Sequence, residues 1–120
     1  MLYRALALAL PGLSSATILY ASSYVAAGNS KALTTLDFTN NSLRVVGTSS
    51  ECGVNPSWLE LKGRTLYCVD EAWSGPHGTL NTFSASSQGA LTKLDSIATY
   101  GGPVSTILYG EGSRGIAVAG

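Results

Sequence analysis

One short apolar segment occurs three times in this chain of 120 residues. Its copies are residues 18–21, 65–69 and 115–118, separated by about 47 and then about 50 residues, and Pro56 recurs as Pro103 at the shorter spacing. A period of about 40–50 residues built only from short strands is typical of a β-propeller, in which each repeat is one blade. The repeat therefore limits the chain to an all-β fold assembled from blades.

Short runs rich in Val, Ile, Leu, Thr and Tyr alternate with Gly, Asn and Ser clusters, which is the pattern of strands separated by turns. The pattern predicts strands near residues 17–24, 32–38, 43–48, 57–61, 64–69, 79–85, 90–97, 104–109 and 115–119. When the repeats are superposed, one complete unit of four strands is preceded by three strands and followed by two.

The expected fold is a partial β-propeller spanning residues 17–120, with about two and a half four-stranded antiparallel blades. The blades are expected at about 17–48, 56–98 and 103–120, and the last is unfinished. Because a propeller closes with about four to eight blades, the chain is interpreted as the N-terminal fragment of a longer ring.

Connections between antiparallel strands fall alternately at the two ends of a blade. Tight-turn sequences such as Asn40-Asn41 lie at one end of the predicted blades. The longer connections, at residues 49–55, 70–78 and 99–102, lie at the other end, which we call the loop-rich face. Binding and catalytic residues are concentrated on loops held by a rigid frame, so this face is the place to look for function.

Residues 1–16 have the features of a secretory signal peptide. Arg4 supplies a positive charge, residues 5–10 form a short apolar core, and Ser14-Ser15-Ala16 offers small residues for cleavage. The sequence therefore predicts a secreted protein, and the alternative is the N-terminus of a cytoplasmic one. No later segment approaches the roughly 20 apolar residues that span a membrane, so no membrane span is expected.

Seven basic and seven acidic residues cancel and are scattered along the chain, which argues against a nucleic-acid partner. Cys52 and Cys68 are the only cysteines, and their spacing does not suit a metal site, so no metal is expected. If the chain is secreted, the two thiols can form a disulfide, and closing a loop of about 15 residues would contribute about 3 kcal/mol. Asn40 begins a glycosylation sequon, Asn-Asn-Ser.

Residues 52–59 and 66–71 resemble the fungal branch of the lactonase seven-bladed propeller family, and residues 78–83 and 101–105 add to the likeness. This family includes bacterial-type 6-phosphogluconolactonase and the fungal 3-carboxy-cis,cis-muconate cyclase. The resemblance implies hydrolysis of a sugar lactone or reversible closure of a muconate, without a cofactor, on a lactone or dicarboxylate substrate. The histidine, arginines and glutamate usually proposed for that chemistry lie in later blades of the family, and none is matched in this chain.

Opening a lactone requires a general base and a donor or cation for the developing oxyanion. The candidate catalytic residues are His77, the only histidine, and the adjacent carboxylates Asp70 and Glu71. Neighbouring residues of a strand point to opposite faces of the sheet, which argues against Asp70 and Glu71 acting together as a catalytic pair. The competing interpretation gives both carboxylates a structural role and makes His77 a solvated loop residue. Trp73 is the candidate ligand contact.

Three functional interpretations follow from these observations. The first is the N-terminal part of a lactonase or cycloisomerase propeller that is inactive as this fragment. The second is a non-catalytic secreted propeller that acts as a binding module, because a fold does not determine a function. The third is a truncated gene product without independent activity.

Overall fold

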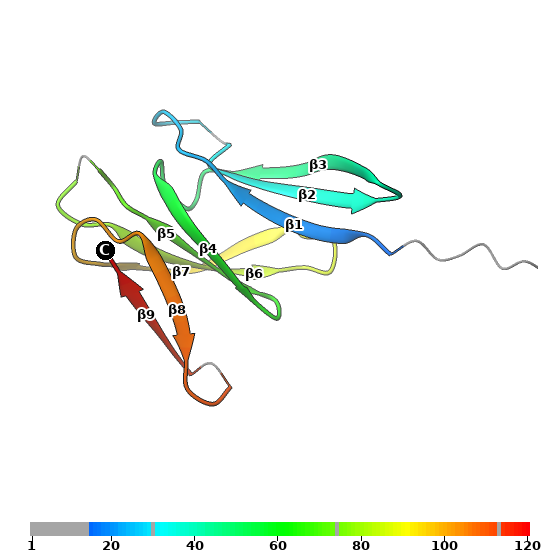
Figure 1. Ribbon diagram of the computed structural model, residues 1–120. Helices are drawn as coiled ribbons and strands as arrows, with labels where there is room; N and C mark the ends of the chain where they lie inside the picture. The colour runs from blue at the N-terminus through cyan, green and yellow to red at the C-terminus, as the bar shows by residue number, and fades with distance from the viewer. Residues whose placement is uncertain (1–14, 30, 74, 113) are drawn as a thin grey trace, which may run out of the picture.

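The computed structural model describes residues 15–29, 31–73, 75–112 and 114–120 (Figure 1). Of the predicted signal peptide, residues 1–14 lie outside the described residues. The regular elements of the described residues are all strands: β1 (Thr17–Ser22), β2 (Leu33–Thr39), β3 (Ser42–Ser49), β4 (Pro56–Lys62), β5 (Thr65–Asp70), β6 (Thr79–Ala85), β7 (Leu91–Ala98), β8 (Ser105–Tyr109) and β9 (Gly115–Ala119).

The strands form three sheets in chain order, which we call blades 1, 2 and 3. Blade 1 has the order β1-β2-β3, blade 2 has β4-β5-β6-β7, and blade 3 has β8-β9. Every pairing is antiparallel between consecutive strands. The predicted fold class, an all-β partial propeller with three, four and two strands, is confirmed.

Strand boundaries differ from the expected ones by at most two residues, and those of β6 and β9 are the expected ones. β1 ends at Ser22 instead of residue 24. The Ser23 N–H still donates to Ala32 O (3.0 Å) in register with β2, but the Val25 N–H donates to Val54 O (2.9 Å) of the 50–55 connection. The chain thereby leaves the ladder with β2. β4 begins at Pro56, and a proline is compatible with the first position of a strand.

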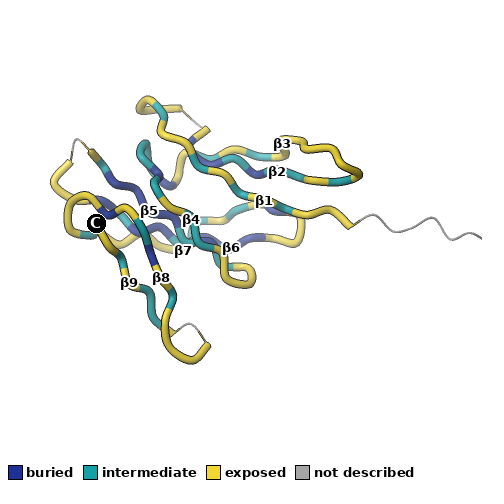
Figure 2. The backbone as a smooth tube through the Cα atoms, viewed as in Figure 1, coloured by how far each residue is buried: buried dark blue, intermediate teal, exposed yellow. Residues whose placement is uncertain are grey.

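The main core lies between blades 1 and 2 (Figure 2). Leu66 and Cys68 of β5 are two residues apart and so project from the same face, and Phe83 of β6 is paired with Leu66. Leu33 of β2 completes the contact from blade 1, and all of these side chains are at most 1% exposed. Two blades packed face to face are the structural unit of a propeller wall.

Gly89, in the turn between β6 and β7, fits tightly against blade 1. Its carbonyl accepts a hydrogen bond from the Tyr20 hydroxyl (3.1 Å), and its φ is +89°. A Cβ added there would lie 2.7 Å from Ile18 Cγ2 and 2.8 Å from Thr35 Cγ2. Only glycine combines this backbone conformation with so close an approach.

Gly89→Ala is therefore expected to destabilise the packing of blade 1 against blade 2. The control is Gly28→Ala, because Gly28 also has a positive φ of +82° but nothing within 4 Å of an added Cβ. We expect Gly89→Ala to lower the free energy of unfolding by about 1–3 kcal/mol more than the control, measured by urea denaturation. Equal losses in the two variants would contradict the interblade contact.

Two hydrogen bonds join β4 of blade 2 to blade 3, one to β8 and one to the connection that precedes it. The Thr106 hydroxyl of β8 donates to Glu60 Oε2 of β4 (3.0 Å), and the Ser57 hydroxyl donates to Pro103 O (3.3 Å). Thr106 is 7% exposed. The second hydrogen bond joins two consecutive repeats, because Ser57 follows Pro56 and Pro103 is the equivalent proline of the next repeat.

Candidate functional site

The loop-rich face carries the connections 23–32, 50–55, 71–78 and 99–104, which gather at the left and top of Figure 1. Two of them pack against each other. A Cβ added to Gly101 would lie 3.2 Å from Pro76 O, and one added to Gly78 would overlap Pro103. The connections of successive blades therefore form one continuous surface.

Asp70 ends β5 on this face and is 9% exposed. Its Oδ1 accepts hydrogen bonds from the backbone N–H groups of Asn55 (3.0 Å) and Ala72 (3.2 Å). Its carboxylate also lies where a Cβ on Gly53 would be. These contacts tie the 50–55 connection to the end of β5, so Asp70 acts as a loop cap in this structure.

Glu71 is also buried, at 8% exposure, and both of its carboxylate oxygens accept hydrogen bonds. Oε1 accepts from the Tyr24 hydroxyl of the 23–32 connection (2.8 Å), and Oε2 accepts from the indole N–H of Trp73. The Tyr24 and Trp73 rings meet edge to face, with centroids 5.3 Å apart. We call these residues the Tyr24–Glu71–Trp73 cluster.

The hydrogen bond to Glu71 raises the pKa of Tyr24 above its usual 10.0, with smaller contributions from partial burial and from the charges of Glu71 and Asp70. A raised tyrosine pKa means that the folded chain favours the neutral hydroxyl. The stability from this contact is fully present below about pH 10 and is lost as the pH rises through the raised pKa.

Glu71→Gln is expected to lower the Tyr24 pKa toward 10.0, because it removes the negative acceptor. The measurement is an NMR titration of the tyrosine rings. Tyr20 is the internal control, because burial alone raises its pKa and its hydroxyl donates to Gly89 O instead. A Tyr24 pKa unchanged in the variant would show that Glu71 does not hold the hydroxyl.

His77 and Trp73 lie on the same loop but differ in their contacts. Trp73 is 73% exposed and hydrogen-bonded to Glu71. His77 is exposed, and among the described residues no hydrogen bond joins it to Asp70 or Glu71. The structure thus brings Glu71 and Trp73 together and leaves the remaining candidates in separate positions.

A disulfide joins Cys52 to Cys68 beneath the loop-rich face. Asn81 of β6, which the sequence pattern did not single out, packs beside it and is 1% exposed. Its amide donates to Cys52 O (3.0 Å) and Thr79 Oγ1 (2.9 Å), and its Oδ1 accepts from the Ser96 hydroxyl (2.8 Å). A lone amide two residues before the core Phe83 is the sequence signal that could have revealed this role.

Asn81→Ala is expected to cost about 1–3 kcal/mol of unfolding free energy, because the Cys52 carbonyl and the Ser96 hydroxyl lose their partner. Thr82→Ala on the other face of β6 is the control and should cost under about 1 kcal/mol. Chemical denaturation followed by circular dichroism measures both. A cost for Asn81→Ala no larger than that of the control would contradict the bridging role.

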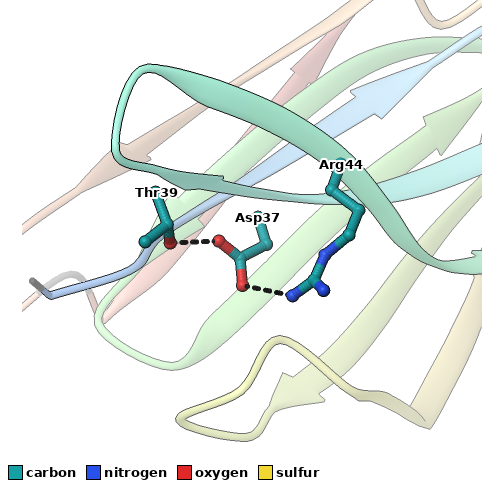
Figure 3. Close-up of polar contacts among 3 residues, drawn as sticks. All are labelled: Asp37, Thr39 and Arg44. Carbon is teal, nitrogen blue, oxygen red and sulfur yellow. Dashed lines mark hydrogen bonds and ion pairs between the residues drawn. The ribbon is translucent and has the colours of Figure 1, made fainter.

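A hollow lies between blades 1 and 2 and extends along β3 from Arg44 to Glu51 of the 50–55 connection. It has a volume of about 720 Å³ and is lined by β2, β3 and the turn containing Gly89. Asp37 lines it, accepts a hydrogen bond from the Thr39 hydroxyl, and pairs with Arg44 of β3 at 3.4 Å (Figure 3). Because Asp37 and Arg44 are directly opposite in the ladder, this is a cross-strand ion pair that supports the sheet.

Asn40 lies at the tip of the β2–β3 turn, away from the loop-rich face. Asn40 and Asn41 have φ values of 52° and 59°, as a two-residue type I′ hairpin turn requires. The Asn40 side chain is exposed. No group of three or more His, Cys, Asp or Glu side chains suited to a metal ion occurs within the described part of the chain.

Consecutive antiparallel blades, packed face to face with tight turns at one end and longer connections at the other, define a protein of the β-propeller class. The family model described as "Lactonase, 7-bladed beta-propeller" matches residues 18–120. The chain belongs to this lactonase family. Neither the curated proteins nor the solved structures compared with the chain contain a match. In the part of the chain that the structure describes, no helix is long and apolar enough to cross a membrane.

Proposed function

We propose that this chain forms the first blades of a lactonase-type ring that acts on a lactone or a dicarboxylate without a cofactor. The reaction is either hydrolysis of a sugar lactone, as in 6-phosphogluconolactonase, or cycloisomerisation of a muconate dicarboxylate. The family match over residues 18–120 is the observation that carries this proposal. The likeness of residues 52–59 and 66–71 to the fungal branch of the family supports the choice of these two reactions.

The contacts of the candidate residues support a framework role for this chain. Asp70 and Glu71 are buried acceptors with their hydrogen bonds already made. Among the described residues the one ion pair joins Asp37 and Arg44, so neither carboxylate is paired with a cation. A base and an oxyanion donor are not assembled by these residues. We therefore propose that the fragment alone is inactive and that a complete ring supplies the missing groups.

Secretion is part of the proposal. Residues 1–16 have the charge, apolar core and small residues of a signal peptide. A buried disulfide and an exposed sequon at Asn40 are both suited to an oxidising, glycosylating compartment. Each can be tested on secreted material by mass spectrometry of the N-terminus, the thiols and Asn40.

The test joins this chain to the remaining blades of a lactonase-family protein and measures turnover of glucono-δ-lactone and of 3-carboxymuconate. The recipient blades without this chain are the control and should be inactive. We expect turnover of one substrate class by the joined ring. Failure of a folded ring to turn over either class would remove the enzymatic proposal and favour a binding module.

A further inference from the structure

The outer face of blade 1, which points away from blade 2, is apolar and exposed. Leu19 of β1 is paired with Leu36 of β2, and Leu36 is paired with Val45 of β3, so the three side chains form one line across this face. Leu19 is 42% exposed and Val45 is 59% exposed. The charged residues of these strands, Asp37 and Arg44, lie on the opposite face and line the hollow. An exposed apolar face of this kind is typical of an interface.

The sequence repeat indicates what kind of surface this face is. Leu19 corresponds to Leu66, and Leu36 corresponds to Phe83, each about 47 residues further along the chain. In blade 2 these two positions are buried, at 1% and 0% exposure, in the core to which blade 1 contributes Leu33. The outer face of blade 1 is therefore the equivalent surface without a blade packed on it.

The outer face of blade 3, which also points away from blade 2, is exposed as well. Thr106 of β8 is buried against β4 of blade 2, so the alternate residues Ile107 and Tyr109 point away from blade 2. They are 64% and 60% exposed. A Cβ on Gly115 would overlap the Tyr109 ring, so this ring lies across β9. Neither β8 nor β9 carries a charged residue.

The two outer faces lie at opposite ends of the series of blades, with blade 2 between them (Figure 1). Blade 2 packs one of its faces on the blade before it and the other on the blade after it. The outer face of blade 1 is of the kind that receives a preceding blade, and the outer face of blade 3 is of the kind that packs on a following blade. A second copy of the chain carries both complementary surfaces, so its docking would continue the packing already present between blades 1 and 2.

The number of blades limits the size of such an assembly. Each copy has three blades, so two copies in head-to-tail order have six, which lies in the range of about four to eight blades that close a propeller. In a closed ring of two copies, blade 3 of each copy lies against blade 1 of the other, and both outer faces are covered. Because closure makes the two contacts together, neither face has to bury by itself the roughly 800 Å² per partner of a standard interface.

We propose that two copies of this chain pair head to tail into a six-bladed ring, with the outer face of blade 1 of each copy packed on the outer face of blade 3 of the other. The pairing concerns the 120-residue chain on its own. It is independent of the lactone reaction, because the remaining blades of a joined ring would cover the same two faces. A chain that fails to pair would leave the proposed function untouched.

The first test is the mass of the chain in solution, measured by sedimentation equilibrium. Because pairing follows mass action, we expect the average mass to rise from one chain toward two between about 1 and 100 µM, and to stop at two. A mass of one chain at every concentration overturns the proposal. A mass that grows beyond two chains also overturns it, because head-to-tail contacts that do not close a ring produce an open filament.

Charge substitutions identify the two faces. Leu19→Asp and Ile107→Lys should each leave the chain a monomer, because each places an unpaired charge in both contacts of the ring. Val45→Asp repeats the test on the outer face of blade 1 at a more exposed position. The matched control is Leu94→Asp, at a side chain of blade 2 that is 60% exposed and lies outside both faces, and it should still pair. Every variant is first checked for wild-type far-ultraviolet circular dichroism.

Mixing the variants tests the head-to-tail order. An equimolar mixture of Leu19→Asp and Ile107→Lys should form dimers again, because one contact of the mixed ring is unsubstituted and the other joins substitutions of opposite charge. A mixture that stays monomeric overturns the proposal. A dimer in Ile107→Lys alone would mean that blade 1 pairs with blade 1 of the other copy, which overturns it equally.

Discussion

Replacing Phe83 with alanine is expected to destabilise the chain more than any of the other substitutions, by about 3–5 kcal/mol. Phe83 is 0% exposed and lies at the centre of the core shared by blades 1 and 2, with Leu33, Leu66 and Cys68. Its removal leaves a cavity between two sheets that cannot close without moving one blade against the other. The loss should appear as a shift of the urea midpoint.

Phe38→Ala is the matched control for this substitution. Phe38 also lies on a strand of blade 1 but is 41% exposed. Its truncation should cost under about 1 kcal/mol, because little apolar area returns to water. If the two phenylalanine variants lost equal stability, the core would not lie between blades 1 and 2.

Removing the disulfide is expected to cost about 3 kcal/mol, the second largest effect. Cys52 and Cys68 are separated by 16 residues, and the bond ties the 50–55 connection to β5. Both side chains are at most 1% exposed, so the double replacement by alanine retains apolar atoms at a buried site. Chemical denaturation of the wild type and the double variant measures the difference.

Reductant provides the control for the disulfide. Dithiothreitol should lower the stability of the wild-type chain toward that of Cys52→Ala/Cys68→Ala and should leave the double variant unchanged. A wild-type chain whose denaturation curve is the same with and without reductant, while its thiols are shown to be free, would mean that the bond contributes nothing.

The strands could be predicted because their pattern is local. Alternating apolar residues, turn dipeptides such as Asn40-Asn41, and a repeat of about 47–50 residues are all readable along the chain. The repeat also predicts the division into three, four and two strands, because each copy marks the same position in a blade. Neither property depends on which side chains meet in space.

The contacts of the candidate site could not be predicted in the same way. Tyr24 and Glu71 are 47 residues apart, and only the packing of blade 1 on blade 2 brings the hydroxyl to the carboxylate. Asn81 is the single amide side chain of β6, a strand that also carries two threonines and a serine, and its partners come from Thr79, the 50–55 connection and β7. Whether a carboxylate is free to act as a base depends on such partners, which a sequence pattern does not contain.

The burial of Asp70 and Glu71 bears directly on whether this chain can catalyse a reaction. Both were candidates for proton transfer, and both are occupied in holding loops and aromatic rings. His77, the remaining candidate, is exposed and has no carboxylate bonded to it among the described residues. We therefore propose, as the central claim, that this chain provides the frame and the loop-rich face of a lactonase-type ring without a complete catalytic site.

The most direct test of that claim is the rate of glucono-δ-lactone and muconolactone opening by the 120-residue chain itself, followed in a pH-stat against buffer. We expect a rate no greater than that of buffer for both lactones. Saturable turnover by the chain alone, abolished in His77→Ala, would contradict the claim and would place a complete active site within these blades.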